Sequence, residues 1–349
     1  MKQETKSQKK YARLIETVEG ASSLVIIMQD HPDPDAVASG AALRRIVNQH
    51  GVVCSMVHGG MVGRSENRAL VNYLDLNLRR LDEVNLESFD LIALVDTQPG
   101  TGNNPLPNDV EPDIVIDHHP IHGPTRSVRF TDIRSGYGAT SSILSEYLQA
   151  AGIEPAPPLA TALLYGIISD TQDLGRRARK ADLDAYFHVS QFANLRMLSE
   201  IQHGPLPDDY YRHLYTALEN ARMFGKCVIT HLGSIDTPDL TGEIADLLVR
   251  HESAEWCLCT GVIDHRLLLS LRARAGGQKN AGHVIKRLVG REGTGGGHHY
   301  LAGGQIKLQS QTKKEIEELH ALLLRRLKKI LHKEDSRARA LVTHPNPPR

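Results

Sequence analysis

The stretch VIIMQDHPDPDAVASG, residues 25–40, joins an apolar run to a cluster of acidic residues. An apolar run that stops at prolines is typical of a buried strand, which here ends near Gln29. Asp30, Asp33 and Asp35 then fall within six residues. Carboxylates this close repel one another unless a cation lies among them. The stretch therefore predicts a buried strand whose carboxyl end carries a site for positive charge.

Apolar strands alternate with helices through the first half of the chain. Buried strands are expected over 22–29, 52–60, 90–98 and 113–120, and helices over 5–20, 35–51, 65–76, 138–152 and 157–174. This alternation predicts βαβ units and a largely parallel sheet. The carboxyl ends of parallel strands meet at one edge, which is where open α/β sheets bind ligands.

We expect an α/β fold with a first, parallel-sheet domain, covered by helices on both faces, and a smaller α/β domain that carries a glycine-rich loop. The expected parts are the parallel-sheet domain over 1–175, a helical connector over 176–220, the smaller domain over 221–334 and a flexible tail over 335–349. The helical region at 175–220 also makes a homodimer an alternative to an ordinary bridge between domains.

Composition limits the classes of function. Lys+Arg and Asp+Glu are both 41, and this balance disfavours a non-specific binder of duplex DNA. The four cysteines form no CxxC pair, so neither a disulfide framework nor a zinc ribbon is expected. The start of the chain is polar and no run approaches about 18 apolar residues, so we expect a soluble cytoplasmic protein without membrane contact.

Four segments deliver carboxylates or imidazoles to the predicted sheet edge. They contribute Asp33 and Asp35 (PDPDA), Asp96 (VDTQ), Asp117, His118 and His119 (IDHHP) and Asp170 (SDTQD). Each aspartate alone is typical of a helix cap. Together, mixed oxygen and nitrogen ligands favour Mn²⁺, with Mg²⁺ or Co²⁺ as alternatives, in a two-metal arrangement suited to phosphoryl transfer.

These segments, in this order and spacing, resemble the four motifs of the DHH phosphoesterases. That superfamily includes RecJ-type exonucleases, nanoRNase/phosphoadenosine phosphatases, cyclic-dinucleotide phosphodiesterases and manganese pyrophosphatases. The later segments SLRAR, NAGHVIKRL and GTGGGHHYLAGG resemble the DHH-associated domain, whose GGGH loop binds substrate. The resemblance covers roughly residues 20–310.

The resemblance implies a role for each matching residue. One metal would be held by Asp33 and Asp96, and the other by Asp35, Asp96, His118 and Asp170, with Asp96 bridging the two. The implied catalytic set is His119 on the scissile phosphate, Asp117 behind the histidines, and Asp96.

One position departs from the family pattern. Many relatives have a metal-binding histidine four residues before the first motif aspartate, where this chain has Gln29. The neighbouring Asp30 and His31 are alternative ligands, and a glutamine would hold the first metal more weakly.

The second domain supplies the expected contacts to the far end of the substrate. They are Arg272, Gly295, Gly296, Gly297, His298 and Gly303. Consecutive glycines let backbone N–H groups approach an anion, and an arginine offers a bidentate phosphate contact.

The expected activity is hydrolysis of very short RNA, above all the linear dinucleotides pGpG and pApA, to nucleoside monophosphates. Hydrolysis of 3′-phosphoadenosine 5′-phosphate is an accompanying expectation. Cyclic-dinucleotide phosphodiesterase and single-strand exonuclease are the alternatives within the superfamily. A nucleotide-binding sensor is the alternative outside enzymes.

Overall fold

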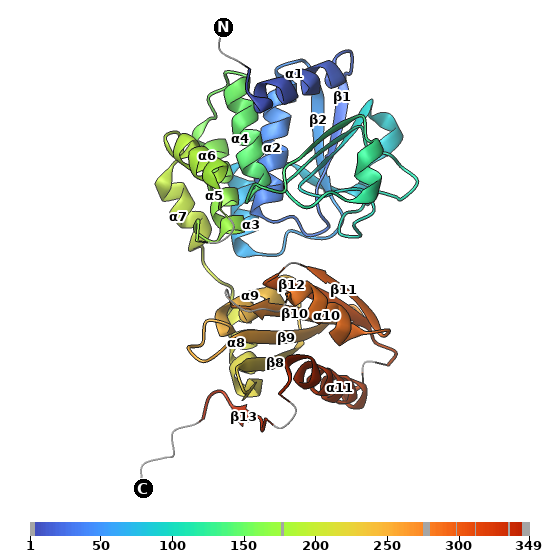
Figure 1. Cartoon of the computed structure of the whole chain (residues 1–349), viewed down its shortest axis with the longest axis vertical. Coiled ribbons are helices and arrows are strands. Elements are labelled where there is room, and N and C mark those ends of the chain that lie inside the picture. Colours follow the sequence, from blue (N-terminus) through green and yellow to red (C-terminus); the bar gives the residue numbers. More distant parts are fainter. Residues whose placement is uncertain are drawn as a thin grey trace. The chain divides into compact units, whose positions relative to one another are not determined.

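The computed structural model describes residues 4–175, 178–274, 280–297, 299–310, 312–333 and 336–343. The chain divides into two compact units between Pro205 and Leu206 (Figure 1). No helix in these described ranges is long and apolar enough to cross a membrane.

The first unit is built on a parallel sheet with the strand order β3-β2-β1-β4-β5-β6. Its strands are β1 (Ser23–Ile27), β2 (Val53–His58), β3 (Leu78–Arg80), β4 (Leu91–Val95), β5 (Ile114–Asp117) and β6 (Phe130–Ile133). Its helices are α1 (Lys6–Val18), α2 (Pro34–Asn48), α3 (Ser65–Tyr73), α4 (Thr140–Ala150), α5 (Pro157–Thr171), α6 (Lys180–Ser190) and α7 (Leu195–Gln202). The predicted α/β class and parallel sheet are confirmed.

Alternate residues of each strand enter different cores, as the period of two requires. Leu24 and Ile26 pack with the α-helices into the larger core. Val25 and Ile27 pack on the opposite face, against residues that include those of the 3₁₀ turns η1 (Leu81–Glu83) and η2 (Leu86–Ser88). A third 3₁₀ turn, η3, spans Gly123–Ser127. Both faces of the sheet are therefore covered, which explains why its inner strands β1 and β4 are predominantly apolar.

The second unit contains a mixed sheet with the order β11-β12-β10-β9-β8-β7-β13. Its strands are β7 (Arg222–Phe224), β8 (Cys227–Ser234), β9 (Trp256–Ile263), β10 (Arg266–Ala273), β11 (Gly293–Gly297), β12 (Leu301–Lys307) and β13 (Arg339–Ala340). Its helices are α8 (Asp208–Asn220), α9 (Asp239–Leu248), α10 (Ala281–Val289) and α11 (Lys313–Leu331). Neighbouring strands pair antiparallel except β8 and β9, which are parallel.

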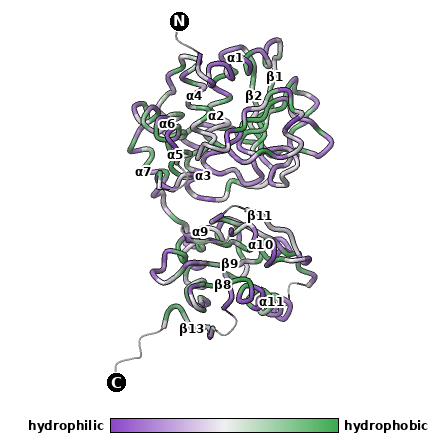
Figure 2. The backbone as a smooth tube through the Cα atoms, in the orientation of Figure 1, coloured by the Kyte–Doolittle hydropathy of each residue, from purple (hydrophilic) through white to green (hydrophobic). Residues whose placement is uncertain are grey.

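Helices cover both faces of this second sheet. Residues of α10 and α11 share one apolar core with Leu258 and Leu267, and residues of α8 and α9 share another with Val228 and Cys257. In Figure 2 the hydrophobic colour concentrates along the inner strands, and α11 alternates between hydrophobic and hydrophilic along its length. This alternation makes α11 an amphipathic helix, with Leu323, Leu327 and Ile330 buried.

The helices of the expected connector, 176–220, lie in both units. Helices α6 and α7 belong to the first unit, and α8 belongs to the second. In the expected tail, Arg339–Ala340 forms β13, which pairs with β7. The boundaries given above as expectations stay predictions.

A pair of histidines in the second unit predicts a pH-dependent stability. His231 on β8 and His320 on α11 lie with ring centroids 4.0 Å apart, and each contacts the hydroxyl of Thr260. Burial, followed by the neighbouring His231, lowers the pKa of His320 to about 4. Below about pH 6.5, His320 therefore binds a proton in the unfolded chain but not in the folded unit. The free energy of unfolding falls between pH 6.5 and 4 as a result, by up to about 3 kcal/mol.

Denaturant unfolding followed by the fluorescence of Trp256, the sole tryptophan, measures this effect in the second unit. The His320→Gln variant is the control, since it keeps a polar side chain but does not titrate. We expect the loss of stability on acidification to be smaller in this variant. Equal pH dependence in both proteins would contradict the prediction.

Candidate metal centre

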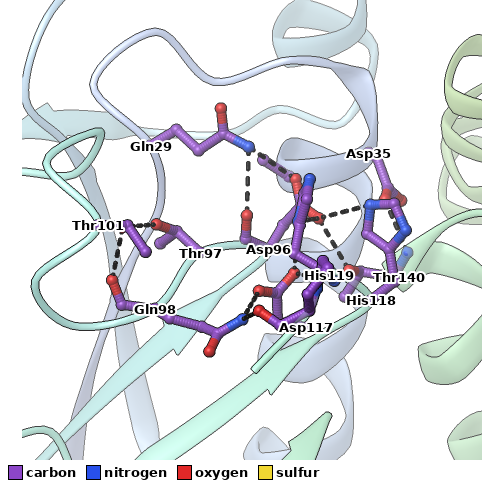
Figure 3. Close-up of polar contacts among 12 residues, drawn as sticks. Gln29, Asp35, Asp96, Thr97, Gln98, Thr101, Asp117, His118, His119 and Thr140 are labelled. Carbon is purple, nitrogen blue, oxygen red and sulfur yellow. Dashed lines mark hydrogen bonds and ion pairs between the residues drawn. The ribbon is translucent and has the colours of Figure 1, made fainter. Parts of the chain in front are cut away.

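The four acidic and histidine segments meet where the strand order of the first sheet reverses. Strand β1 lies between β2 and β4, so the connections from β1 and β4 leave in opposite directions. The residues after β1, β4 and β5 then come together at the carboxyl ends of these strands, which is the ligand-binding position of open α/β sheets. Figure 3 shows this group of side chains.

Asp96 lies at the centre of the group and is only 1% exposed. It follows β4 with a φ of 60°, a left-handed conformation that is uncommon outside glycine. Its Oδ1 accepts a hydrogen bond from the Thr140 hydroxyl at 2.8 Å, and its Oδ2 accepts one from Gln29 Nε2 at 2.8 Å. The backbone strain is characteristic of a functional site.

Asp35, in the first turn of α2, is fully buried against the start of α4. Its two carboxylate oxygens accept the backbone N–H groups of Thr140 and Ser141, each at 2.7 Å. These are first-turn N–H groups of a helix, which carry partial positive charge and have no partner inside the helix. The helix start thus fixes the orientation of this carboxylate.

His118 presents a buried nitrogen that has no hydrogen-bond partner. Its Nδ1 lies 3.3 Å from the carbonyl of Tyr137, which holds the proton on that nitrogen. Its Nε2 lies 3.2 Å from Asp170 Oδ2 and 3.6 Å from Asp96 Oδ1 without forming a hydrogen bond. A nitrogen that points between carboxylates, on a ring whose other nitrogen is held by a carbonyl, is arranged as a metal ligand, and a bound cation would displace its proton.

His119 is held by Asp117. Its Nδ1 lies 2.8 Å from Asp117 Oδ1, and the other oxygen of Asp117 accepts a hydrogen bond from Gln98 Nε2 at 2.6 Å. Burial acts to raise the pKa of Asp117, but the bond to His119 and the charges of both imidazoles outweigh it and lower the pKa. Asp117 is thus an ionised carboxylate placed to orient His119.

The carboxylates of the group oppose one another's ionisation. Burial, followed by the charges of Asp35 and Asp33, raises the pKa of Asp96 well above its ordinary value. Burial lowers the affinity of His118 for a proton, yet Asp170, Asp35 and Asp117 outweigh this and raise its pKa to about 10. Negative charge concentrated in this way attracts a cation.

The residues present fit a divalent cation. Ligand atoms of Asp35, His118 and Asp170 lie within 4.8 Å of one another, as do those of Asp96, Asp117, His118 and His119. Buried oxygen ligands with one imidazole suit Mn²⁺ or Mg²⁺. Asp35, Asp96, His118 and Asp170 would hold such an ion.

The other predicted metal ligands have different surroundings. Asp33 caps α2 by accepting the N–H of Ala36 at 2.9 Å. Burial, followed by the negative charges of Asp170 and Asp35, raises the pKa of Asp33 to about 7. Asp33 therefore interacts electrostatically with the other carboxylates of the group. His31 instead contacts the backbone of Met61 at 3.3 Å.

Asp30 lies away from Asp96. Its backbone bonds Asn103 and Gly60, and a Cβ on Gly59 would collide with its carboxylate. Burial raises its pKa, while the nearby His31 and His58 act in the opposite direction. Of the three alternative ligands, Gln29 is thus the one whose side chain contacts Asp96.

The predicted substrate contacts of the second unit lie in its sheet. Gly295, Gly296 and Gly297 form β11 rather than a loop, and Gly296 pairs with Gly303. Arg272 on β10 bonds the carboxylate of Asp246 at 2.6 Å. His298 lies outside the described residues.

The sequence analysis did not predict several residues of the site. Thr140 and Ser141 support the carboxylates, and Gln98 holds Asp117. Gln98 stands in VDTQ shortly after Asp96, which is the only signal that pointed to it. Thr140 opens a helix of ordinary composition, and nothing in its sequence marks it.

Gly166 on α5 lets that helix pass close to Asp35. A Cβ there would collide with Ser141 Oγ and lie 3.1 Å from Asp35 Cα. We expect Gly166→Ala to displace Asp35 and to reduce turnover by about 10²-fold, since small misplacements of reacting groups cost this much. Gly136→Ala is the control, because a Cβ at Gly136 meets nothing within 4 Å. Full activity in Gly166→Ala would contradict the requirement for close approach.

The chain matches the DHH family, N-terminal domain, over residues 24–167, and the DHHA1 domain over residues 225–329. It therefore belongs to the DHH family of phosphoesterases, with the associated DHHA1 domain. The predicted family is confirmed.

Three proteins illustrate the similarity. An uncharacterized protein of Methanocaldococcus jannaschii is 31% identical over 83% of this chain, which spans 59% of that protein's length. The crystal structure of an exopolyphosphatase-related protein from Bacteroides fragilis has a TM-score of 0.74 and 14% identity, covering 93% of this chain and 98% of that one. RecJ from Thermus thermophilus in complex with Mn²⁺ has a TM-score of 0.54 and 14% identity, covering 93% of this chain and 54% of that one. At these identities the two structures show a shared fold.

Proposed function

We propose that this chain is a metal-dependent phosphodiesterase that hydrolyses very short oligoribonucleotides, especially pGpG and pApA, to nucleoside monophosphates. We extend the proposal to 3′-phosphoadenosine 5′-phosphate as a second substrate. The observation that carries it is the buried His118 Nε2, which has no hydrogen-bond partner and faces Asp96 and Asp170 at the switch point of the sheet. The cation proposed is Mn²⁺, which the similar RecJ structure contains.

The chain's own residues suit hydrolysis at phosphorus. A divalent cation at this site would polarise the phosphoryl oxygens and acidify a water molecule. In the reaction, an oxygen–phosphorus bond forms from water while the bond from phosphorus to the departing ribose oxygen breaks. That oxygen takes up a proton, and His119, held by Asp117, is the group placed to supply it. Asp35 and Asp96 are fixed by their hydrogen bonds before substrate arrives.

The preference for short substrates is supported by charge. Lys+Arg and Asp+Glu are equal at 41 each, whereas proteins that track long nucleic acids usually carry a basic excess. A dinucleotide presents little phosphate outside the metal centre and needs no such surface.

A panel of substrates tests the proposal. Purified protein with Mn²⁺ is incubated with pGpG, a seven-nucleotide RNA, cyclic di-AMP and 3′-phosphoadenosine 5′-phosphate, and the products are separated by chromatography. We expect pGpG to be cleaved fastest, with GMP as the product. Faster cleavage of cyclic di-AMP or of the heptamer would replace the proposed substrate class with one of the alternatives. Binding of all four without cleavage would indicate a sensor.

A further inference from the structure

The side of Asp96 that faces Gln29 is closed to cations. Gln29 Nε2 lies 2.8 Å from Asp96 Oδ2 and 3.2 Å from the Asp96 backbone oxygen (Figure 3). The backbone oxygen of Asp96 can only accept hydrogen bonds, as can its carboxylate when ionised, so the amide presents its N–H₂ group to them. An N–H donor offers no lone pair to a metal ion and its partial positive charge repels one.

The opposite side of Asp96 offers a nitrogen without a hydrogen-bond partner, although Asp96 Oδ1 also accepts the hydroxyl of Thr140 at 2.8 Å. There His118 Nε2 lies 3.6 Å from Asp96 Oδ1 and 3.2 Å from Asp170 Oδ2, buried and without a hydrogen bond. Asp35 completes this side, since its ligand atom lies within 4.8 Å of those of His118 and Asp170. One cation can therefore find three clustered ligands on this side, Asp35, His118 and Asp170, with Asp96 Oδ1 next to His118 as a fourth.

A second cation on the Gln29 side would find fewer ligands. Asp33 is the remaining carboxylate of the predicted ligand set, and one of its oxygens already accepts the N–H of Ala36 at 2.9 Å. Asp33 belongs to neither group of clustered ligand atoms among the described residues. Small divalent cations that find one or two carboxylates complete their shell with water and with the phosphate oxygens of a substrate.

We infer that the resting protein holds a single divalent cation, between Asp35, Asp96, His118 and Asp170, and that a second binds only together with the phosphate of a ligand, because Gln29 blocks its site. This inference rests on the proposed function for the identity of the phosphate ligand. Gln29 is then a residue that sets metal stoichiometry.

Mn²⁺ binding to the metal-stripped full chain tests this directly. We expect calorimetry to give one tight Mn²⁺ per chain, with a second at least about 10-fold weaker. Addition of GMP, the expected product, should bring in the second ion. Electron paramagnetic resonance should show isolated Mn²⁺ without GMP and an exchange-coupled pair with it.

Substitutions at Gln29 separate the amide's effect from a general disturbance. Gln29→His and Gln29→Glu supply a lone pair and should bind two tight Mn²⁺ without GMP. Gln29→Met has similar length but offers no oxygen or nitrogen, and should keep a single tight ion. Two tight, coupled ions in the unsubstituted protein would overturn the inference, as would a Gln29→Met protein that matches Gln29→His.

These readouts do not depend on turnover. Cleavage of pGpG by a protein that already holds two tight ions would leave the proposed function in place and overturn this inference. One tight ion in a protein that cleaves none of the substrates would support this inference and contradict the proposed function.

Discussion

We expect Asp96→Asn to abolish the proposed Mn²⁺-dependent cleavage of pGpG, with kcat/KM reduced by at least about 10³-fold. Asp96 is the carboxylate that approaches His118 Nε2 on one side and Gln29 on the other. Asparagine removes its charge while keeping its shape. Because asparagine tolerates a left-handed backbone, the φ of 60° at this position costs little in the variant. The loss therefore reports the charge rather than backbone strain, and is measured by steady-state kinetics with bound Mn²⁺ quantified in parallel.

The matched control is Asp75→Asn. Asp75 also has a left-handed backbone, with a φ of 47°, but it is exposed and follows α3. This variant should retain the activity and the Mn²⁺ content of the unsubstituted protein. An Asp96→Asn protein that folds and still turns over pGpG within about 10-fold of normal would show that the cluster is not the reaction centre.

We expect Arg134→Met to destabilise the first unit by about 3–5 kcal/mol. Arg134 is 4% exposed, and two of its nitrogens bond Asp132 Oδ2 at 2.9 and 2.6 Å. A third donates to Glu146 at 2.7 Å. Removing the guanidinium leaves the buried Asp132 without its charge partner, and the penalty for an uncompensated buried charge accounts for most of the effect. Denaturant unfolding followed by far-ultraviolet circular dichroism gives the change in free energy.

Arg80→Met provides the comparison for this prediction. Arg80 and Asp82 form an ion pair of 2.6 Å, but their side chains are 53% and 63% exposed, so solvent screens the attraction. Its loss should cost far less than the loss of Arg134, because exposed ion pairs contribute little to stability. Similar costs for both substitutions would mean that the Arg134 network contributes no more than a surface pair.

The sequence reveals the central strands but not the edge ones. β1, β2, β4 and β5 are apolar runs because both faces of each strand are buried, and this composition is what the prediction detects. β3, with the sequence LRR, and β6, with the sequence FTDI, were missed. Each pairs with a single neighbour and has partly exposed residues, so its register is set by the tertiary structure rather than by its own composition.

The residues of the site also fall into those that the sequence indicates and those that only the folded structure reveals. Ionisable side chains at strand ends, such as those of Asp96 and His118, are visible in the sequence because such residues are unusual directly after a buried strand. Neutral donors such as Thr140 and Gln29 acquire their roles only through the folded geometry. The glycines of β11 resemble a loop in sequence, and only their pairing with β12 makes them a strand.

The most direct test of the account is the dependence of pGpG cleavage on added metal. The protein is stripped with a chelator, the chelator is removed by dialysis, and GMP release is measured before and after addition of Mn²⁺. The account predicts no release from the stripped protein and full recovery as Mn²⁺ binds at the cluster of Asp35, Asp96, His118 and Asp170. Undiminished release from the stripped protein, or none from protein that has bound Mn²⁺, would contradict it.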